Sequence, residues 1–470
     1  MSDPETRQSS LKQLAHRVGG NRVVRASSAA GTIKGAGLVA AFLLQMLLAR
    51  VVADPSEYGV YAWGQNLLFL LGSLFALGIP LATSRLVAVH AGRGDRDSLD
   101  HVGRSGARWL ALASLAGASI AVGVVFLLPE AAFSELPRPV ALLSIAASPL
   151  VAFTLFHQAM ARAQSRLVSA FLPTQVLRPV FAGGLSVAWF LWVDSNPSGI
   201  EVLFAVALSL LLVLIVQWFI ARRRRLAPSN DGSGDGSATD RQNYGSDRII
   251  PTALPMFATR LSDIFIQYGN VLVLGIIGGP LAAAGFFVAD RLSHLASVPR
   301  SVISSVVQPW LASAHAEHDE QRLQQVVRHA GHTTLWPTLA IAATVAIAGH
   351  FLLGLFGMEY RSAFPILVVL LSSHVLGAAL GPAQQLLMMT GHQKSVMHVM
   401  ALASLCHLLL LLVMIPWLGA VGAAFATLVS TLVARIGCLR LVRSRLKIEP
   451  SIQFATTTSN SAGASIDDDE

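Results

Sequence analysis

The sequence predicts an all-α, polytopic membrane protein with about twelve transmembrane helices. Hydrophobic residues make up 53% of the 470 residues, and charged residues make up 13%, well below the roughly 25% of an average globular protein. The mean hydropathy is +0.59, and apolar stretches of membrane-spanning length recur along the whole chain. A chain of this composition has more apolar surface than a water-exposed fold can bury, so a bilayer is its expected solvent.

Twelve apolar windows are each close to the length of about 20 residues that a spanning helix needs. In the first half of the chain they cover 35–52, 60–80, 107–128, 140–160, 169–193 and 202–221. In the second half they cover 252–277, 282–311, 335–355, 363–390, 395–415 and 420–439. Turn-forming or polar segments separate consecutive windows, as expected for a chain that crosses the membrane repeatedly.

The distribution of Lys and Arg predicts the orientation. If the amino terminus is cytoplasmic, only Arg50, Arg138 and Arg361 fall at external turns, whereas basic clusters such as 222–225 fall inside. The positive-inside rule therefore predicts a multi-pass protein of the plasma (inner, cytoplasmic) membrane with both termini in the cytoplasm. The basic residues form no continuous face, so nucleic acid is not an expected partner.

Composition divides the chain into five segments. They are a basic cytoplasmic arm at 1–34, an N-terminal six-helix bundle at 35–227, a flexible cytoplasmic linker at 228–248, a C-terminal six-helix bundle at 249–447 and a disordered cytoplasmic tail at 448–470. The arm has no early apolar core or cleavage site, so a signal peptide is not expected. The linker is rich in Ser, Gly, Asp and Asn, which predicts flexibility.

The two bundles carry traces of an internal repeat. Leu48, Gly59 and Tyr61 match Leu274, Gly285 and Phe287 at one constant offset, and Lys34 matches Arg260 at the same offset. Each half therefore contains a helix end, a short external turn and a Gly-x-aromatic sequence that opens the next helix. Parallel repeats of this kind relate two halves by a pseudo-two-fold axis along the membrane normal.

Four stretches carry a resemblance to a known family. The stretch 48–61 (LARVVADPSEYGVY) resembles the first helix–turn–helix of the polysaccharide-transport flippases, a branch of the multidrug/oligosaccharidyl-lipid/polysaccharide exporter superfamily that includes O-antigen flippases. The stretches 285–292 (GFFVADRL), 356–363 (FGMEYRSA) and 419–427 (GAVGAAFAT) are similar to later motifs of this family and occur in the same order. The resemblance spans nearly the whole chain.

The resemblance implies two six-helix bundles around a central cavity that opens alternately to either side of the membrane. It implies a flippase that moves a lipid-linked oligosaccharide, carried on a polyprenyl phosphate or diphosphate, from the cytoplasmic to the outer leaflet for surface glycan synthesis. Membrane lipids, glycan polymerases and glycosyltransferases are the accompanying partners. Two alternatives within the superfamily remain open: a multidrug or cation antiporter, and a lipid II-type flippase, which usually has fourteen helices.

Charged and polar side chains inside the apolar windows are the candidate site residues, because such groups are costly in a bilayer and mark transport paths. Arg260, Asp263, Gln267 and Asn270 share one helix face, and Asp290 and His294 begin a similar face in the next window. The expected contacts to an anionic head group are Arg260, Arg291, Lys34 and Arg178, and the expected polar or coupling residues of the cavity are Asp263, Asp290, Gln267, Asn270 and His294.

Structural explanations compete with several of these assignments. Arg260 and Asp263 are three residues apart and could simply neutralise one another. Arg300 is expected to extend to the membrane surface. His294, His374 and His407 could titrate in a proton-coupled cycle, but each is expected to be a buried histidine satisfied by a neighbour. No catalytic triad, Walker motif, zinc motif or cysteine pair occurs, so the sequence predicts a transporter, not an enzyme, with no cofactor and no metal.

Overall fold

The computed structural model describes residues 31–93, 96–133, 135–193, 195–225, 249–304, 307 and 320–446. Helices are the only regular elements within these ranges, which confirms the all-α prediction. The segments predicted as the linker at 228–248 and the tail at 448–470, and the predicted arm as far as residue 30, lie outside the described residues.

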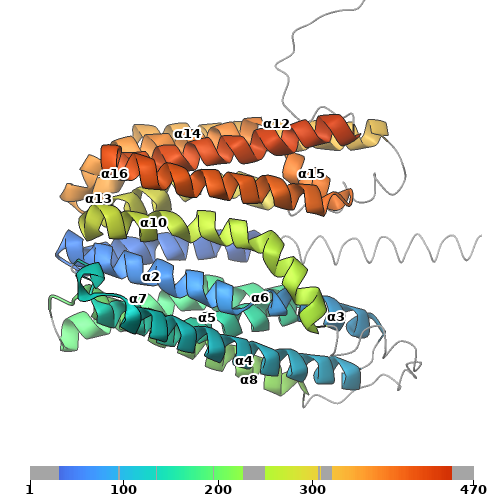
Figure 1. Cartoon of the computed structure of the whole chain (residues 1–470), viewed down its shortest axis with the longest axis horizontal. Helices are drawn as coiled ribbons and strands as arrows, with labels where there is room; N and C mark the ends of the chain where they lie inside the picture. The colour runs from blue at the N-terminus through green and yellow to red at the C-terminus, as the bar shows by residue number, and fades with distance from the viewer. Residues whose placement is uncertain are drawn as a thin grey trace, which may run out of the picture.

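The described helices divide into an N-terminal half and a C-terminal half (Figure 1). The N-terminal half contains a first helix, Gly31–Val51, followed by α2 (Pro55–Phe75), α3 (Ile79–Arg93), α4 (Arg96–Leu127), η1 (Glu130–Phe133), α5 (Arg138–Ala163), α6 (Leu167–Leu172), η2 (Pro173–Leu177), α7 (Arg178–Trp192) and α8 (Gly199–Arg225). The C-terminal half contains α10 (Ile249–Ser293), η4 (His294–Ser297), α12 (Glu320–Ile347), α13 (Gly349–Phe356), η5 (Met358–Ala363), α14 (Phe364–Ala379), α15 (Ala383–Met389) and α16 (Gln393–Leu446).

Two of these elements are too long to be single membrane passes. At about 1.5 Å per residue, α10 with 45 residues and α16 with 54 residues exceed twice the thickness of a bilayer core. Each is broken by a glycine with positive φ, Gly279 (φ 82°) in α10 and Gly419 (φ 58°) in α16. His407 Nδ1 lies 3.3 Å from the carbonyl oxygen of Ala426. Residues so far apart in sequence meet only if α16 folds back as a hairpin.

Length and hydropathy alone identify seven described helices that could cross a membrane, or nine if each bent pair counts as one span. The bent pairs are α2 with α3, which turn by 51°, and α12 with α13, which turn by 67°. Counting α10 and α16 as hairpins, and the continuous helical segment from Leu167 to Trp192 as one span, reproduces the predicted windows one to one. The predicted windows therefore coincide with helical segments of the structure, although length and hydropathy by themselves identify at most nine spans among the described residues.

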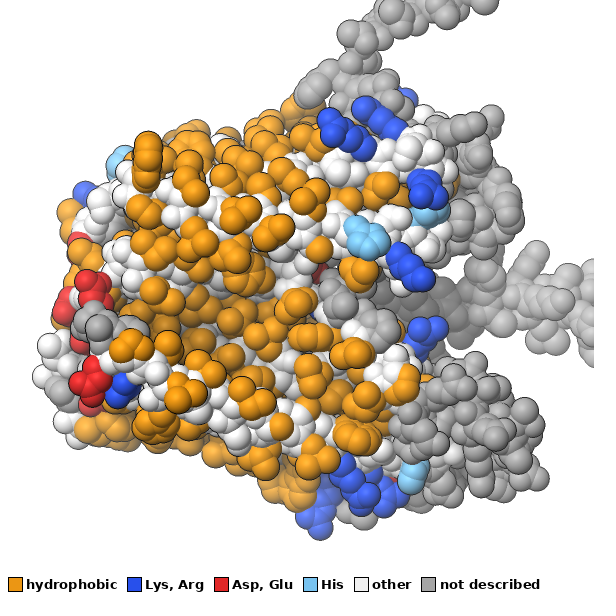
Figure 2. Space-filling model, in the orientation of Figure 1, with side chains coloured by type: hydrophobic (Ala, Val, Ile, Leu, Met, Phe, Trp, Pro, Cys, Tyr) orange, Lys and Arg blue, Asp and Glu red, His pale blue; other side chains and the backbone are white. Residues whose placement is uncertain are grey.

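Side chains on the surface are arranged as expected for a protein embedded in a bilayer. Figure 2 shows a broad apolar band across the middle of one face, with Lys and Arg at one end and Asp and Glu at the other. The basic end carries the beginning of α4 and the last turns of α8 and α16, with Arg104, Arg222 and Arg440. The acidic end carries the turns at Asp54 and Glu130. The apolar band therefore fits the hydrocarbon layer, and the two ends face its two sides.

The halves meet mainly along α2 and α10, which lie against each other at the boundary (Figure 1). Gly59 of α2 approaches the backbone of Pro280 so closely that a Cβ atom at residue 59 would overlap the Pro280 carbonyl. Trp63 Nε1 donates a hydrogen bond to the carbonyl oxygen of Leu272 (3.2 Å), and Arg50 donates to the carbonyl oxygens of Gly354 and Leu355 (2.9 Å each). These contacts join the two halves near the acidic end.

Candidate functional site

Two arginines from opposite halves lie on either side of the boundary between α2 and α10. Arg178 begins α7, and its Cζ lies 4.9 Å from the centre of the Phe69 ring. Arg291 lies in the second arm of α10, with Cζ 4.5 Å from the centre of the Phe287 ring. The two guanidinium groups are within electrostatic range of each other. The fold therefore concentrates positive charge at this point in spite of the repulsion between like charges.

Tyrosines form the rest of this site. Tyr268 of α10 stacks on Phe69, with ring centres 6.2 Å apart, and it lies within electrostatic range of both Arg178 and Arg291. Tyr61 lies near the same two arginines, and its ring meets the ring of Phe287 edge to face. The site is thus lined by aromatic faces, which hold the guanidinium groups through cation–π contacts.

Hydrogen bonds within the N-terminal half fix the orientation of the tyrosines. Tyr58 Oη donates to Gln45 Oε1 (3.1 Å), and Gln65 Nε2 donates to Tyr61 Oη (2.8 Å). Gln45 also approaches Tyr61 through its Nε2 atom (3.3 Å). A buried network in which each polar atom has a partner is rigid, so the aromatic wall of the site is held in place before any ligand arrives.

Neither arginine of this pair has a carboxylate partner among the described residues. Both make cation–π contacts, and the Nε atom of Arg291 is buried without a hydrogen-bond partner. A buried charged donor without an acceptor costs at least about 1–3 kcal/mol. We therefore call Arg178, Arg291 and the tyrosines Tyr61 and Tyr268 the arginine–tyrosine site, a place in which an anion would satisfy two charges.

A second polar region, the C-half cavity, lies entirely within the C-terminal half and has a volume of about 370 Å³. All five residues predicted as cavity or coupling residues line it: Asp263, Asp290, Gln267, Asn270 and His294. The cavity also exposes Arg300, Ser373, His374, Thr427 and Arg435. The fold back at Gly279 brings the two polar faces of α10 together, because the two arms of the hairpin are antiparallel.

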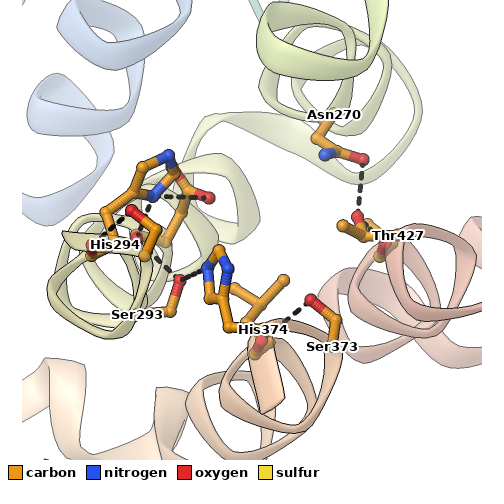
Figure 3. A network of polar contacts seen from close by, with 10 residues as sticks. Asn270, Ser293, His294, Ser373, His374 and Thr427 are labelled. Atoms are coloured by element: carbon orange, nitrogen blue, oxygen red, sulfur yellow. Dashed lines mark hydrogen bonds and ion pairs between the residues drawn. The ribbon is translucent and has the colours of Figure 1, made fainter. Parts of the chain in front are cut away.

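Hydrogen bonds connect the arms of this cavity (Figure 3). His294 Nδ1 donates to the carbonyl oxygen of Asp290 (2.7 Å) and lies 3.5 Å from the Asp290 carboxylate. Ser293 Oγ lies 3.4 Å from His374 Nε2, and the rings of His294 and His374 are 5.8 Å apart. On the opposite side, Thr427 Oγ1 donates to Asn270 Oδ1 (3.3 Å). The cavity wall therefore links α10, α14 and α16 through neutral polar groups.

The charges of the C-half cavity balance, in contrast to those of the arginine–tyrosine site. Two carboxylates, Asp263 and Asp290, share it with two guanidinium groups, Arg300 and Arg435. Arg435 lies within electrostatic range of Asp263 and donates a hydrogen bond to Gln384 Oε1 (3.4 Å). Contrary to the prediction that Arg300 extends to the membrane surface, Arg300 lines this cavity among its polar side chains.

The remaining predicted contacts lie apart from both sites. Arg260 is exposed and does not line the C-half cavity; it is within electrostatic range of Asp263 and of Arg162 at the end of α5. Lys34 in the first helix is half-buried, with Nζ 4.9 Å from the centre of the Phe171 ring. The four predicted cations are therefore not gathered in one place: Arg178 and Arg291 come together, whereas Arg260 and Lys34 do not join them.

Sequence reasoning missed several residues of these sites. Arg435 resembles the first member of the basic cluster after the last span, although it lies a full turn inside that window. Tyr61 and Tyr268 resemble ordinary apolar positions, because only their neighbours across the boundary make them part of a charged site. The signal for Arg435 was its position within the window; the tyrosines had no local signal.

The described residues contain no group of three or more His, Cys, Asp or Glu side chains placed to hold a metal ion. Cys406 and Cys438 are both free thiols. The chemistry available at the two sites is therefore ionic and hydrogen-bonding: recognition of an anion at the boundary, and exchange of partners among balanced charges in the C-half cavity.

Solved structures share the fold. The chain superimposes on an inward-facing multidrug resistance MATE family transporter of the MOP superfamily with a TM-score of 0.70, at 17% identity over 87% of this chain and 94% of that chain. It superimposes on the inward-closed lipid II flippase MurJ with a TM-score of 0.68, at 13% identity over 88% and 87%. A MOP superfamily transporter from Pyrococcus furiosus gives a TM-score of 0.61, at 16% identity over 90% and 95%.

These likenesses show that the chain shares the fold of transporters of the MOP superfamily. No curated protein sequence matches the chain significantly. The sequence model of the family described as "Polysaccharide biosynthesis protein" matches residues 23–315, which is more than half of the chain. The chain therefore belongs to the polysaccharide biosynthesis protein family.

Proposed function

We propose that the protein is a flippase that moves a lipid-linked oligosaccharide, carried on a polyprenyl phosphate or diphosphate, from the cytoplasmic to the outer leaflet by alternating access. The observation that carries this proposal is the arginine–tyrosine site. Arg178 and Arg291 belong to different halves, lie within electrostatic range of each other and have no carboxylate partner among the described residues. A diphosphate supplies the missing negative charge, and its oxygen atoms match the planar fork of a guanidinium group.

Three further cations fit a path toward this site. Arg260 and Arg162 belong to different halves and lie within electrostatic range of each other, and the half-buried Lys34 lies on the first helix. These positive charges would attract a phosphate head group from the cytoplasmic leaflet, and the head group would then move from them to Arg178 and Arg291. The partly exposed Tyr268 would then contact the sugar by stacking and hydrogen bonding, while the lipid chain stays in the bilayer.

Membrane potential can supply the energy for this movement. Each negative charge moved outward across an inside-negative membrane gains about 2.3 kcal/mol per 100 mV. A head group with two charges is therefore favoured in the outward direction without ATP. In this proposal both termini and the basic end face the cytoplasm, and the halves 35–227 and 249–447 are the two moving bundles.

The solved structures that share this fold have two different described functions. MurJ is described as a lipid II flippase, and the MATE proteins are described as multidrug resistance transporters. A multidrug or cation exporter needs carboxylates that are free to meet a cationic substrate. In this chain Asp263 and Asp290 share their cavity with Arg300 and Arg435, so the charge distribution favours an anionic, lipid-linked substrate.

The test is a translocation assay with purified protein in liposomes that carry a polyprenyl diphosphate oligosaccharide labelled on the sugar. A sugar-modifying enzyme added outside measures the fraction that has reached the outer leaflet. We expect the protein to accelerate this transfer and the Arg178→Ala/Arg291→Ala double variant to abolish the acceleration. Transport of a cationic dye without transfer of the labelled lipid would overturn the proposal in favour of a multidrug exporter.

A further inference from the structure

A groove on the N-terminal half has no part in the proposed transport path. The helices α4 and α8 both pack against α5 but hardly touch one another, so a groove remains between them over α5. Its volume is about 660 Å³, which lies within the range of ligand-binding pockets. It is lined by the first turns of α4 and the last turns of α5 and α8, which places it at the basic end of the apolar band.

The groove combines an apolar wall with a charged rim. Its wall includes Phe153, Ile215 and Trp218, and Ile215 and Trp218 are 42% and 47% exposed. The rim includes Arg104 from α4 and Arg166 from the turn after α5. Apolar surface below and cations at the membrane interface are the pattern that a lipid with an anionic head group requires, and tryptophan commonly lies at this level of the bilayer.

A buried amide beside the groove has no partner. Both side-chain polar atoms of Gln217, Nε2 and Oε1, lack a hydrogen bond, although the residue is only 5% exposed. Gln217 lines a recess of about 70 Å³ that shares His157, Gln164 and Arg166 with the groove. Leaving buried polar groups unpaired costs free energy. A hydroxyl group can satisfy both atoms, because it donates to Oε1 and accepts from Nε2.

We propose that this groove binds one anionic glycerophospholipid with a hydroxyl-bearing head group, drawn from the leaflet at the basic end. The phosphate lies between Arg104 and Arg166, and a head-group hydroxyl enters the recess and pairs with Gln217. The acyl chains follow the apolar wall between α4 and α8. Asp100, whose carboxylate also lines the rim, accepts a hydrogen bond from a second hydroxyl and disfavours a head group that carries phosphate alone.

Native mass spectrometry of the full-length protein in detergent tests this proposal. The probes are phosphatidylglycerol and phosphatidylcholine with identical acyl chains. We expect one phosphatidylglycerol to bind at least ten-fold more tightly than phosphatidylcholine, and Arg104→Ala/Arg166→Ala to remove the preference. Arg440→Ala, an exposed arginine at the same end of the C-terminal half, is the matched control and keeps the preference.

Two further variants separate lipid binding from general charge effects. Ala107 lines the groove, and Ala107→Trp fills it without changing any charge, so the tightly bound phosphatidylglycerol is lost. Gln217→Leu removes the unpaired amide; it raises the melting temperature in phosphatidylcholine and reduces the additional stabilisation by phosphatidylglycerol. Equal binding of both lipids to the unmodified protein, or full phosphatidylglycerol binding by Ala107→Trp, would refute the proposal.

The outcome is independent of the proposed transport function. Arg178 and Arg291 do not line the groove, so the Arg178→Ala/Arg291→Ala variant keeps the phosphatidylglycerol preference even where flipping is lost. Loss of lipid binding in that variant would show that the bound phospholipid occupies the arginine–tyrosine site, and it would overturn the assignment to the groove.

Discussion

Removing one guanidinium group from the arginine–tyrosine site should weaken substrate binding by a predictable amount. Arg178 and Arg291 approach the boundary from opposite halves, and each is held against a phenylalanine ring rather than by a carboxylate. Arg178→Ala and Arg291→Ala therefore remove a charge without freeing a buried acid. Their effect on a ligand is easier to interpret than that of most charge deletions inside a membrane protein.

The magnitude follows from the contacts that each arginine can offer. A hydrogen bond to a charged group contributes about 1.5–3 kcal/mol, and each 1.4 kcal/mol is a factor of ten in affinity. One arginine that contacts the diphosphate is therefore expected to account for a roughly 10- to 150-fold change in Kd. A lysine keeps the charge but not the fork, so Arg291→Lys should retain an intermediate affinity.

Binding of a short-chain polyprenyl diphosphate to protein in nanodiscs measures these changes at constant salt. The double variant provides a stricter test, because groups that contact the same ligand show non-additive effects. If both arginines hold one diphosphate, the double variant loses less than the product of the two single losses. Arg328→Ala, an exposed arginine at the basic end, is the control. Unchanged affinity in both single variants would refute the reasoning.

Three further perturbations address the boundary and the C-half cavity. A Cβ atom at Gly275 would lie 2.5 Å from Cδ1 of Trp63, so Gly275→Val should push the halves apart and destabilise this conformation by about 1–3 kcal/mol, seen as a lower melting temperature. Arg50→Ala removes two hydrogen bonds between the halves and should increase the separation of spin labels placed in each half at the acidic end. Arg435→Leu removes the hydrogen bond to Gln384 and one of the two cations within electrostatic range of Asp263 and should cost about 1–3 kcal/mol, measured by thermal unfolding in detergent; adding Asp263→Asn should restore part of the loss.

Controls exist within the chain for each of these changes. Gly184 lies in a helix where a Cβ atom would have no neighbouring atom within 4 Å, so Gly184→Val should leave the melting temperature almost unchanged. An unaltered spin-label distance in Arg50→Ala would show that its carbonyl contacts do not hold the halves together. Failure of Asp263→Asn to rescue Arg435→Leu would show that Arg435 contributes through packing and not through charge balance.

The hydropathy pattern of the sequence predicted where the apolar helical segments lie, but it did not predict which charged residues come together. Hydropathy predicted the positions and the order of these segments, because a helix in lipid must satisfy its backbone internally and present about 20 apolar residues. The spacing of Arg260, Asp263, Gln267 and Asn270 predicted a shared face; the last three line the C-half cavity, whereas Arg260 does not. These properties are local: they depend on the helix period and on the length of each window.

Tertiary structure alone decided which charges meet. The reversal at Gly279 brings Asp263 and Asp290 into one cavity, and a second reversal at Gly419 allows Arg435 to join them. The contact between halves pairs Arg178 with Arg291 and leaves Arg260 exposed outside the C-half cavity. Electrostatic interaction depends on distance in space, and helix periodicity carries no information about the neighbouring helix. The sequence could therefore identify the charged residues as candidates. Only their packing distinguished the arginine–tyrosine site, which has excess positive charge, from the C-half cavity, in which the charges balance.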